Sequence, residues 1–500
     1  MAEQLATIAL DTDDVVADVP RTIFGGFAEH MGRCIYGGIY DPESGQADEN
    51  GIRRDVAEAL REMDLSVLRY PGGNFVSSYD WRDGVGPRDQ RPRRRELAWQ
   101  QIETNQFGTN EFIDCCRQMK IEPMLAVNLG TGGIMEAANL VEYCNAPVGT
   151  QYADLRASHG YPRPHGVKYW CLGNEMDGTW QVGQMTAEDY AKKAREAGKI
   201  MRLVDPSIQN IICGSSGPWM KTFPNWDRTA LEWCWEFSHY LALHNYATAW
   251  EGTTTDFLAY SNEFERHIDT LATILRETKQ KLGAKNDIYL SQDEWNVWYK
   301  DRDMAGRWRV APPLCEETYN LEDALVVAQW LNVFIRKCDV LRMACLAQVV
   351  NTIAPLKTRG DELLRESTFY PFVMYSQHAR GRSLRPSVRA ATIASQRFGD
   401  VPQIDVSATV DAERNRAAVF IVHRAQAERL PIEITFTGPA APIRVLQARQ
   451  MWGLDPKAAN TFDRPEVILP RDLAPMPVRE GKLHLKLPPL SLTMLELQTP

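Results

Sequence analysis

The 500-residue sequence lacks several features that would assign a protein to a class at once. No stretch approaches the ~18 consecutive apolar residues that suggest a membrane span, so we expect no membrane association. The net charge is −9, whereas nucleic-acid binding normally needs a concentrated basic face. The one basic run, Arg91-Pro-Arg-Arg-Arg95, is short and isolated, and we interpret it as solvated surface. We therefore expect no nucleic-acid partner, whereas a neutral polar ligand remains open.

Signals for metals, redox chemistry, nucleotides and secretion are also absent. The 10 cysteines form no C-x-x-C pair and the 9 histidines no i, i+4 pair, which argues against a zinc site and favours buried free thiols. Gly130-Thr-Gly-Gly133 does not complete a dinucleotide-binding motif, because Met135 stands where the third glycine belongs. The first 14 residues show no basic segment followed by a long apolar run. We expect no cofactor, no metal, no secretion signal and a cytoplasmic location.

The order of periodic segments predicts the fold of the larger part of the chain. Between about residues 20 and 375, short apolar runs alternate with helical patterns, which is typical of βα units and a parallel sheet. Eight such units predict an α/β fold with a (β/α)8 TIM barrel, which we place at residues 19–384. The eight predicted strands are Ile23–Glu29, Ser66–Tyr70, Pro123–Asn128, Val167–Asn174, Asn210–Ser215, Tyr240–Tyr246, Asp287–Glu294 and Met343–Val350.

After about residue 385 the apolar period changes from 3.6 to 2. Ile404, Val406, Ala408 and Val410 alternate with polar residues, and later segments repeat this pattern between turn residues. This pattern predicts a C-terminal antiparallel β-sandwich, jelly-roll-like, over residues 385–500. Leu5–Leu10 alternates in the same way, so we expect residues 1–18 to complete the sandwich.

Polar side chains stand where the predicted barrel strands end. The carboxyl ends of barrel strands and the loops after them form the active face of a TIM barrel. Charged side chains are rarely buried without partners, so we expect Glu29, Arg69, Glu175 and Glu294 to face one polar cavity. Each one alone could instead cap a helix or form an ion pair. Their convergence with several amides favours a ligand rich in hydroxyl groups.

Two of these carboxylates match the requirement of glycoside hydrolysis. One carboxyl group protonates the leaving oxygen, and a second attacks the anomeric carbon or activates water. Glu175 and Glu294, after the fourth and seventh strands, could flank a sugar ring. Five tryptophans fall in or beside the predicted top face and could pack on sugars, although any one could equally fill space under a loop. They are Trp81, Trp99, Trp180, Trp295 and Trp298.

Four segments in this order resemble glycoside hydrolase family 51, whose α-L-arabinofuranosidases are the most similar members. The segments are Phe24-Gly-Gly-Phe-Ala-Glu-His-Met-Gly32, Arg69-Tyr-Pro-Gly-Gly-Asn-Phe75, Gly173-Asn-Glu-Met-Asp-Gly178 and Asp293-Glu-Trp-Asn-Val-Trp-Tyr299. The resemblance covers essentially the whole chain. It implies a retaining double displacement with Glu175 as acid/base and Glu294 as nucleophile.

The resemblance also implies a set of substrate-binding residues around an arabinofuranose. They are Glu29, Arg69, Asn74, Asn174, Tyr246 and Gln348. Asn174 would bond the 2-hydroxyl and Tyr246 would orient Glu294. Gln348 is aligned on the short Ala347-Gln348 match, and Asn351 is a nearby alternative.

We therefore expect an exo-acting α-L-arabinofuranosidase that hydrolyses terminal arabinofuranosyl groups from arabinose-containing oligosaccharides. The alternatives are an endoglucanase or β-xylosidase on the same scaffold, or a carbohydrate-binding protein without catalysis. A closed pocket would favour the first reading and an open cleft the second. The resemblance further implies homo-oligomers, often hexamers.

Overall fold

Eight short parallel strands close into a barrel in the computed structural model, which describes residues 5–249, 252–299, 307–474 and 476–500. The predicted TIM barrel is confirmed, with each predicted strand at its expected place in the chain. Neighbouring strands follow the order β10-β11-β12-β3-β4-β7-β8-β9 around the barrel. The strands are β3 (Gly25–Phe27), β4 (Val67–Tyr70), β7 (Glu122–Val127), β8 (Tyr169–Leu172), β9 (Gln209–Cys213), β10 (Tyr240–Ala247), β11 (Tyr289–Val297) and β12 (Leu341–Ala347).

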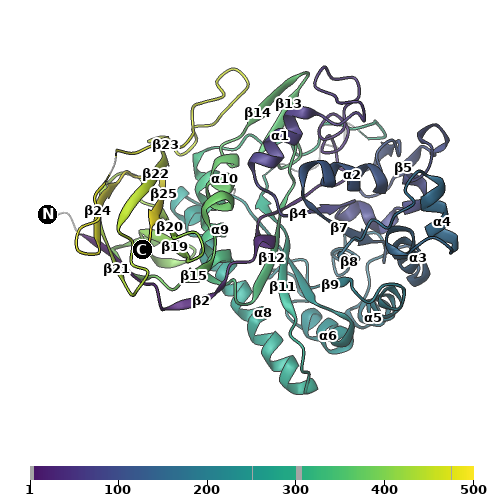
Figure 1. The fold of residues 1–500 in the computed structure, drawn as a ribbon, viewed down its shortest axis with the longest axis horizontal. Helices are drawn as coiled ribbons and strands as arrows, with labels where there is room; N and C mark the ends of the chain where they lie inside the picture. The colour runs from purple at the N-terminus through teal and green to yellow at the C-terminus, as the bar shows by residue number, and fades with distance from the viewer. Residues whose placement is uncertain (1–4, 250–251, 300–306, 475) are drawn as a thin grey trace.

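Helices cover the outside of the barrel (Figure 1), and a cluster of buried apolar side chains fills its interior. Phe27, Met124, Cys171 and Met343 belong to one buried cluster inside the strands, so the barrel is a packed core and not a pore. The helices are α1 (Arg54–Glu62), α2 (Thr109–Met119), α3 (Ile134–Asn145), α4 (Gln151–Ser158), α5 (Ala187–Val204), α6 (Asn225–Cys234), α7 (Thr254–Leu258), α8 (Ser261–Leu282), α9 (Leu321–Arg336) and α10 (Phe369–His378).

Local sequence signals explain where several helices begin and which face they bury. Thr186 is the N-cap of α5, and its hydroxyl accepts a hydrogen bond from Asp189 N at 3.2 Å. In α8, Phe264 and Ile268 lie on the buried face, four residues apart as the helical period requires.

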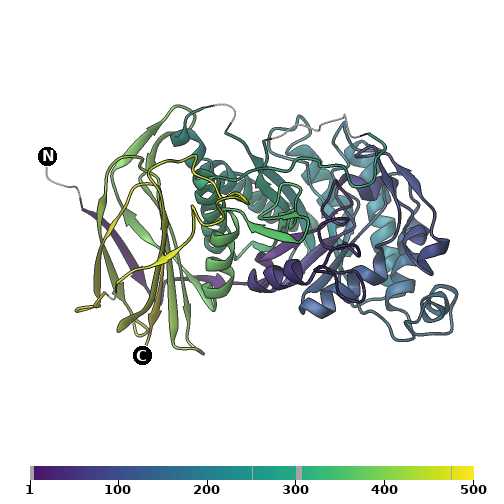
Figure 2. The same cartoon turned by 90° about the horizontal axis from the view of Figure 1, so that it is seen from above.

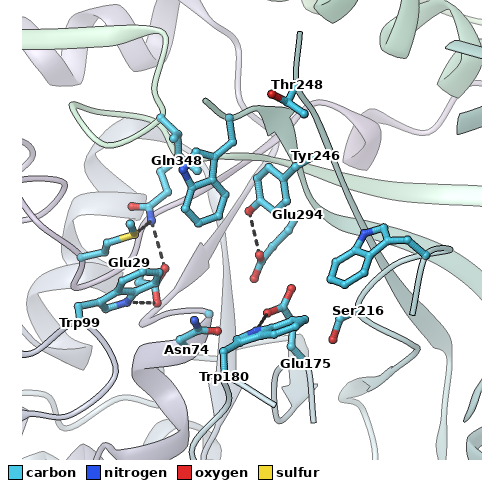
Figure 3. Close-up of a pocket in the computed structure, with 15 residues that line it drawn as sticks. Glu29, Asn74, Trp99, Glu175, Trp180, Ser216, Tyr246, Thr248, Glu294 and Gln348 are labelled. Carbon is cyan, nitrogen blue, oxygen red and sulfur yellow. Dashed lines mark hydrogen bonds between the residues drawn. The ribbon is translucent and has the colours of Figure 1, made fainter. Parts of the chain in front are cut away.

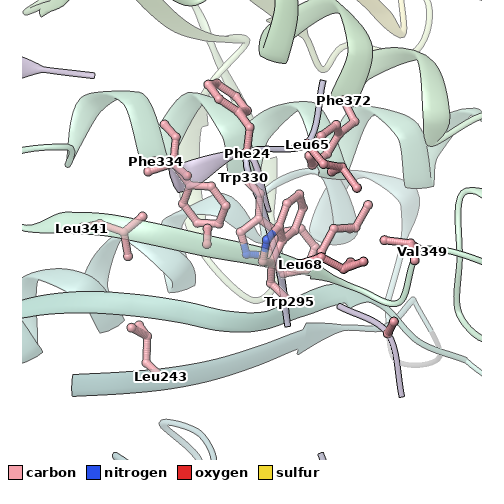
Figure 4. Packing of buried hydrophobic residues seen from close by; sticks show 14 of the residues in the cluster. Phe24, Leu65, Leu68, Leu243, Trp295, Trp330, Phe334, Leu341, Val349 and Phe372 are labelled. Atoms are coloured by element: carbon pink, nitrogen blue, oxygen red, sulfur yellow. The ribbon is translucent and has the colours of Figure 1, made fainter. Parts of the chain in front are cut away.

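The core between β11 and the helices outside it is rich in aromatic rings (Figure 4). Trp330 on α9 stacks on Phe264 with ring centroids 3.8 Å apart, and Trp295 packs edge-on against Phe334 at 5.1 Å. Alternate side chains of a strand point to opposite faces. Trp295 therefore faces the helices, whereas its neighbour Glu294 faces the barrel interior.

The C-terminal residues form two sheets that pack face to face, which confirms the predicted sandwich. The first sheet has the order β16-β1-β21-β24 and the second β2-β15-β19-β20-β25-β22-β23. Strand β1 runs parallel to β21, an exception to the antiparallel pattern. The strands are β1 (Ala6–Asp11), β2 (Val15–Asp18), β15 (Arg382–Leu384), β16 (Ser387–Arg389), β19 (Ile404–Asp411), β20 (Arg416–His423), β21 (Leu430–Thr437), β22 (Arg444–Trp452), β23 (Arg471–Asp472), β24 (Lys482–Leu487) and β25 (Ser491–Gln498).

Short two-stranded ribbons decorate both parts. They are β5–β6 (Arg94–Glu96 and Gln101–Glu103), β13–β14 (Leu356–Arg359 and Glu362–Arg365) and β17–β18 (Thr392–Ser395 and Gly399–Pro402). Among the described residues, no helix is both long enough and apolar enough to cross a membrane.

The sandwich lies beside the barrel, with α9 and α10 between the two (Figure 2). Charged contacts join them, since Arg336 on α9 binds Asp405 on β19 at 2.8 Å and Arg424 donates to Gln329 at 2.7 Å. Both β1 and β2 pair with strands of the sandwich, and residues 1–4 lie outside the described part. Because β15 is paired with β19, we propose to draw the domain boundary before Arg382, slightly earlier than residue 385.

Candidate active site

A cavity of about 440 Å³ opens at the carboxyl ends of the barrel strands (Figure 3). Its walls come from the ends of β3, β4, β8, β9, β10, β11 and β12 and from the loops that follow them. This is the active face of a TIM barrel. The lining residues are Glu29, Met31, Gly73, Asn74, Trp99, Glu175, Trp180, Ser216, Trp219, Tyr246, Thr248, Glu294, Trp298, Gln348 and Ile353.

Two carboxylates face each other across this cavity. Glu294 lies within β11, and Glu175 lies on the turn after β8. A carboxylate oxygen of each and a ring nitrogen of His244 all lie within 4.8 Å of one another. Glu175 has a backbone φ of +45°, in the left-handed region that non-glycine residues rarely adopt. Such conformations concentrate at functional sites.

Glu294 is held by two donors. Arg69 Nη1 donates to Glu294 Oε1 at 2.7 Å, and the Tyr246 hydroxyl donates to Oε2 at 2.9 Å. Arg69 is buried, and its second terminal nitrogen donates to Asn174 Oδ1 at 2.7 Å. A buried guanidinium between a carboxylate and an amide fixes both in orientation. The arrangement points the Glu294 carboxyl group at the cavity.

Glu175 is more enclosed than an ordinary glutamate. Burial is the main cause that raises its pKa, and the charge of Glu294 adds to it. Hydrogen bonds from His244 Nδ1 at 2.9 Å and from Trp180 Nε1 at 2.7 Å act in the opposite direction. The net direction is upward, which keeps a proton on Glu175 to a higher pH than usual.

His244 lies between the carboxylates and was not among the residues predicted from the sequence. Burial alone would lower its pKa, but the charge of Glu294 and the contacts with Asp293 and Glu175 raise it to about 10. Its Nε2 lies 3.2 Å from Asp293 Oδ1. Burial would raise the pKa of Asp293, yet the charge of Arg69 and the His244 bond hold it below its usual value. At neutral pH, His244 is therefore a cation next to three carboxyl groups.

Glu175, His244 and Glu294 lie close enough together to be considered as metal ligands. One imidazole and two carboxylates could in principle hold a divalent metal. However, both ring nitrogens of His244 already face carboxylates, Nδ1 toward Glu175 at 2.9 Å and Nε2 toward Asp293 at 3.2 Å. The donor chemistry therefore fits an acid/base pair better than a metal centre.

The far wall of the cavity is made of groups that can bond sugar hydroxyls (Figure 3). Glu29 accepts hydrogen bonds from Trp99 Nε1 at 2.9 Å, Gln348 Nε2 at 3.1 Å and Phe75 N at 3.0 Å. Burial and the charge of Glu294 raise the pKa of Glu29 to about 8. Glu29 can therefore accept or donate a hydrogen bond near neutral pH.

The structure brings together all eight residues singled out from the sequence. Glu29, Asn74, Glu175, Tyr246, Glu294 and Gln348 line the cavity directly. The other two, Arg69 and Asn174, are buried directly behind Glu294, and Asn174 also donates to Asn74 Oδ1 at 3.4 Å.

The alternative Asn351 does not line the cavity. Its amide donates to Arg33 O at 2.9 Å and to the Thr358 hydroxyl at 3.0 Å, and its side chain is fully buried. The structure therefore places Gln348 in the cavity and gives Asn351 a role in joining the loop after β12 to β13.

Three of the five predicted tryptophans line the cavity and two do not. Trp99, Trp180 and Trp298 are in its wall. Trp81 instead packs against Tyr143 at 5.2 Å, and Trp295 lies in the helix-facing core. The first fills space under a loop, and the second follows from the alternation of strand side chains.

The sequence interpretation missed several residues of the site. His244 precedes Tyr246 by two positions on β10, so the period of the strand indicates that both face the cavity. Ser216 and Trp219 come from the irregular loop between β9 and α6, where no periodicity indicates direction. Thr248 follows β10 and was equally unmarked.

Two family descriptions match the chain. "Alpha-L-arabinofuranosidase 1 domain" matches residues 59–266, and "Alpha-L-arabinofuranosidase C-terminal domain" matches residues 293–491. The chain is 41% identical to the intracellular exo-α-(1→5)-L-arabinofuranosidase 1 of Bacillus subtilis, over 99% of both chains. The chain belongs to glycoside hydrolase family 51.

Further family 51 proteins and structures agree. The intracellular exo-α-(1→5)-L-arabinofuranosidase of Acetivibrio thermocellus is 44% identical, over 84% of this chain and 85% of that protein. A family 51 α-L-arabinofuranosidase structure from Bifidobacterium longum superposes with a TM-score of 0.95 at 37% identity, and all of both chains is covered. As a member of family 51, the protein is a glycoside hydrolase. Its fold is the one predicted from its sequence.

Proposed function

We propose that the protein is a retaining, exo-acting α-L-arabinofuranosidase in which Glu175 is the acid/base and Glu294 the nucleophile. The observation that carries the proposal is the carboxylate pair, whose nearest oxygens lie within 4.8 Å in a walled cavity. Retaining glycosidases hold their carboxyl groups about 5–5.5 Å apart, whereas inverting ones need about 6.5–9.5 Å to admit a water. The spacing therefore supports retention.

In the first step, Glu175 donates its proton to the departing glycosidic oxygen while Glu294 attacks the anomeric carbon. The bond to the leaving group breaks as the ester to Glu294 forms. The raised pKa of Glu175 keeps it protonated for this step. Arg69 and Tyr246 hold the attacking carboxylate in place.

In the second step, water replaces the leaving group. Once Glu294 is esterified its negative charge is gone, so the pKa of Glu175 falls and the residue loses its proton more readily. Glu175 then takes a proton from water, the oxygen attacks the anomeric carbon, and the ester breaks. Two displacements on one carbon release arabinose with the original configuration.

The shape of the cavity supports removal of terminal sugars. Trp99 and Gln348 both donate hydrogen bonds to Glu29, and these three side chains form the far wall of the cavity. A sugar seated there cannot continue into a longer chain on that side. We assign Glu29, Arg69, Asn74, Asn174, Tyr246 and Gln348 to the binding of this terminal arabinofuranose, with Asn174 near its 2-hydroxyl.

The natural substrate class follows from the relatives. Proteins from Bacillus subtilis and Acetivibrio thermocellus carry names that specify exo-α-(1→5)-L-arabinofuranosidase activity and an intracellular location. We propose that this chain likewise acts in the cytoplasm on arabinose-containing oligosaccharides, and all 10 of its cysteines are free and buried. The resemblance to family 51 also predicts a homo-oligomer, often a hexamer. This prediction can be tested by light scattering.

The alternatives are less well supported. An endoglucanase needs a cleft open at both ends, which the wall formed by Glu29, Trp99 and Gln348 disfavours. A protein that only binds carbohydrate would not need two carboxylates at the spacing of a retaining enzyme. Rapid hydrolysis of an aryl β-glucoside, with none of an aryl α-L-arabinofuranoside, would support the endoglucanase, whereas binding of arabinose without turnover of any aryl glycoside would support the carbohydrate-binding protein.

The test of the proposal uses Glu175→Ala, with Glu188→Ala on the exposed face of α5 as the matched control. We expect Glu175→Ala to slow an aryl arabinofuranoside with a poor leaving group by roughly 10²–10⁴-fold, and an activated one much less. Azide should restore turnover and give an arabinosyl azide of retained configuration, identified by NMR. An inverted product would refute the retaining assignment.

A further inference from the structure

The backbone at Glu175 is held in a conformation that the residue would not adopt by itself. Glu175 has φ of +45°, and Gly178 N donates to its carbonyl at 2.9 Å to close a tight turn. A left-handed non-glycine residue persists only where its surroundings over-determine it. The carboxyl group of Glu175 can point at the leaving group only while this turn is held.

Asp177, two residues further along, anchors the turn. Its side chain is buried and accepts hydrogen bonds from the Ser215 hydroxyl at 2.7 Å and the Thr222 hydroxyl at 2.6 Å. It also accepts from the backbone N of Ser216 at 3.0 Å and, through a short contact, from the hydroxyl of that residue. Four donors on one carboxylate come from a single neighbouring loop between β9 and α6.

That loop also forms part of the cavity. Ser216 and Trp219 line the cavity, and Trp219 is 66% exposed at its mouth. The Trp219 ring lies 5.8 Å from that of Trp180, whose Nε1 donates to Glu175 Oε2. The turn that carries Glu175 is therefore tied to this loop at two places, by Asp177 and by the contact between Trp180 and Trp219.

We propose that Asp177 is a positioning residue that keeps Glu175 at the leaving-group oxygen by joining its turn to the β9–α6 loop. The inference rests on the proposed function, because it concerns the acid step of that reaction. Asp177 is absent from the cavity wall, so it acts on the substrate only through Glu175 and the loop. A small displacement of a reacting group can slow a reaction by about 10²-fold.

The experiment compares Asp177→Ala with Asp227→Asn. Asp227 is a matched control because it is also buried and binds the same loop, where its Oδ1 accepts from Ser215 N at 3.0 Å, but among the described residues it makes no hydrogen bond to the Glu175 turn. Asp177→Asn is a conservative variant that keeps the shape and one acceptor oxygen. Circular dichroism and thermal unfolding establish that each variant is folded.

The readout is kcat/KM for two aryl α-L-arabinofuranosides, one with a poor and one with an activated leaving group. We expect Asp177→Ala to lose about 10²-fold on the poor leaving group and only a few-fold on the activated one, because only the first needs an aligned acid. Asp177→Asn should recover part of the loss, and Asp227→Asn should stay close to wild type on both.

Equal losses on the two substrates, or no loss, in folded Asp177→Ala would overturn the inference. If Asp177→Ala does not fold, Thr222→Val is used instead, because it removes one hydrogen-bond donor and leaves Asp177 in place. The inference then requires that Thr222→Val lose more kcat/KM on the poor leaving group than on the activated one, by a smaller factor than Asp177→Ala. The two proposals fail differently. A wild-type protein that turns over neither substrate contradicts the proposed function, whereas an active wild type with equal losses contradicts only the role of Asp177.

Discussion

Replacing Trp180 by phenylalanine should raise the pH at which the enzyme loses activity on the alkaline side. Trp180 Nε1 donates to Glu175 Oε2 at 2.7 Å, while the other oxygen accepts from His244. The indole bond favours the carboxylate and so lowers the pKa of Glu175. Phenylalanine keeps an aromatic ring but cannot donate. The pKa of Glu175 should therefore rise in the variant.

The size of the shift follows from the exposure of the bond. A hydrogen bond to a charged group contributes about 1.5–3 kcal/mol. Trp180 is 37% exposed, so water replaces part of the lost bond, and we take about half of that value, roughly 0.75–1.5 kcal/mol. At about 1.36 kcal/mol per pKa unit, the expected upward shift is about 0.5–1 unit.

The assay is kcat/KM against pH on an aryl α-L-arabinofuranoside with a poor leaving group. The alkaline limb of this profile reports the free enzyme's essential acid, which must be protonated. Trp219→Phe is the control, since Trp219 contacts Trp180 but makes no hydrogen bond to a carboxylate within the described part of the chain. The alkaline limb of the Trp219→Phe profile should stay at the wild-type pH. A limb that moves to lower pH in Trp180→Phe, or moves equally in both variants, would refute the reasoning.

Two further predictions concern stability, measured by urea unfolding. Trp330→Ala should lower the free energy of unfolding by about 3–5 kcal/mol, because the Trp330 ring is fully buried. Trp452→Ala is the control and should lower it far less, because Trp452 is 40% exposed. Similar losses in the two variants would contradict the packing shown in Figure 4. Asp256→Ala should lose about 2–4 kcal/mol, since its carboxylate accepts from the Ser395 hydroxyl at 2.7 Å and joins the barrel to the sandwich. The Ser395 bond holds the pKa of Asp256 below its usual value, so the loss should be full at neutral pH and shrink below about pH 4. Asp361→Ala on the surface should show a smaller loss, and a loss from Asp256→Ala that does not change with pH would contradict the assignment.

Much of the site could be predicted because strand ends are marked in the sequence. Each barrel strand is a short apolar run, and the residue that breaks the run lies at the active face. Glu175 and Glu294 were found in this way. Glu294 and Trp295 show what a strand end alone does not predict. The two residues are neighbours on β11, but their side chains point to opposite faces of the strand. The two-residue period of a strand predicts this difference, because adjacent side chains point to opposite faces.

Other residues carried no such mark. His244 could have been inferred from Tyr246, which lies two positions later on the same strand. Trp219 could not, because the loop between β9 and α6 has no regular period to indicate where its side chains point. Asp177 belongs to the Gly173–Gly178 segment that resembles family 51, yet its role depends on hydrogen-bond donors at residues 215–222, which the neighbouring sequence does not reveal.

The sequence by itself determined the type and order of the elements, the barrel followed by the sandwich, and the polar residues at the strand ends. These are local properties, since the side-chain period and the end of an apolar run are read within a few residues. Only the tertiary structure decided the distance between the two carboxylates, the bond between His244 and Glu175 across 69 residues, and the tie between the Glu175 turn and the next loop. The physical reason is that protonation and orientation depend on charges and donors within a few ångströms. Closure of the barrel brings those groups together from segments far apart in the chain.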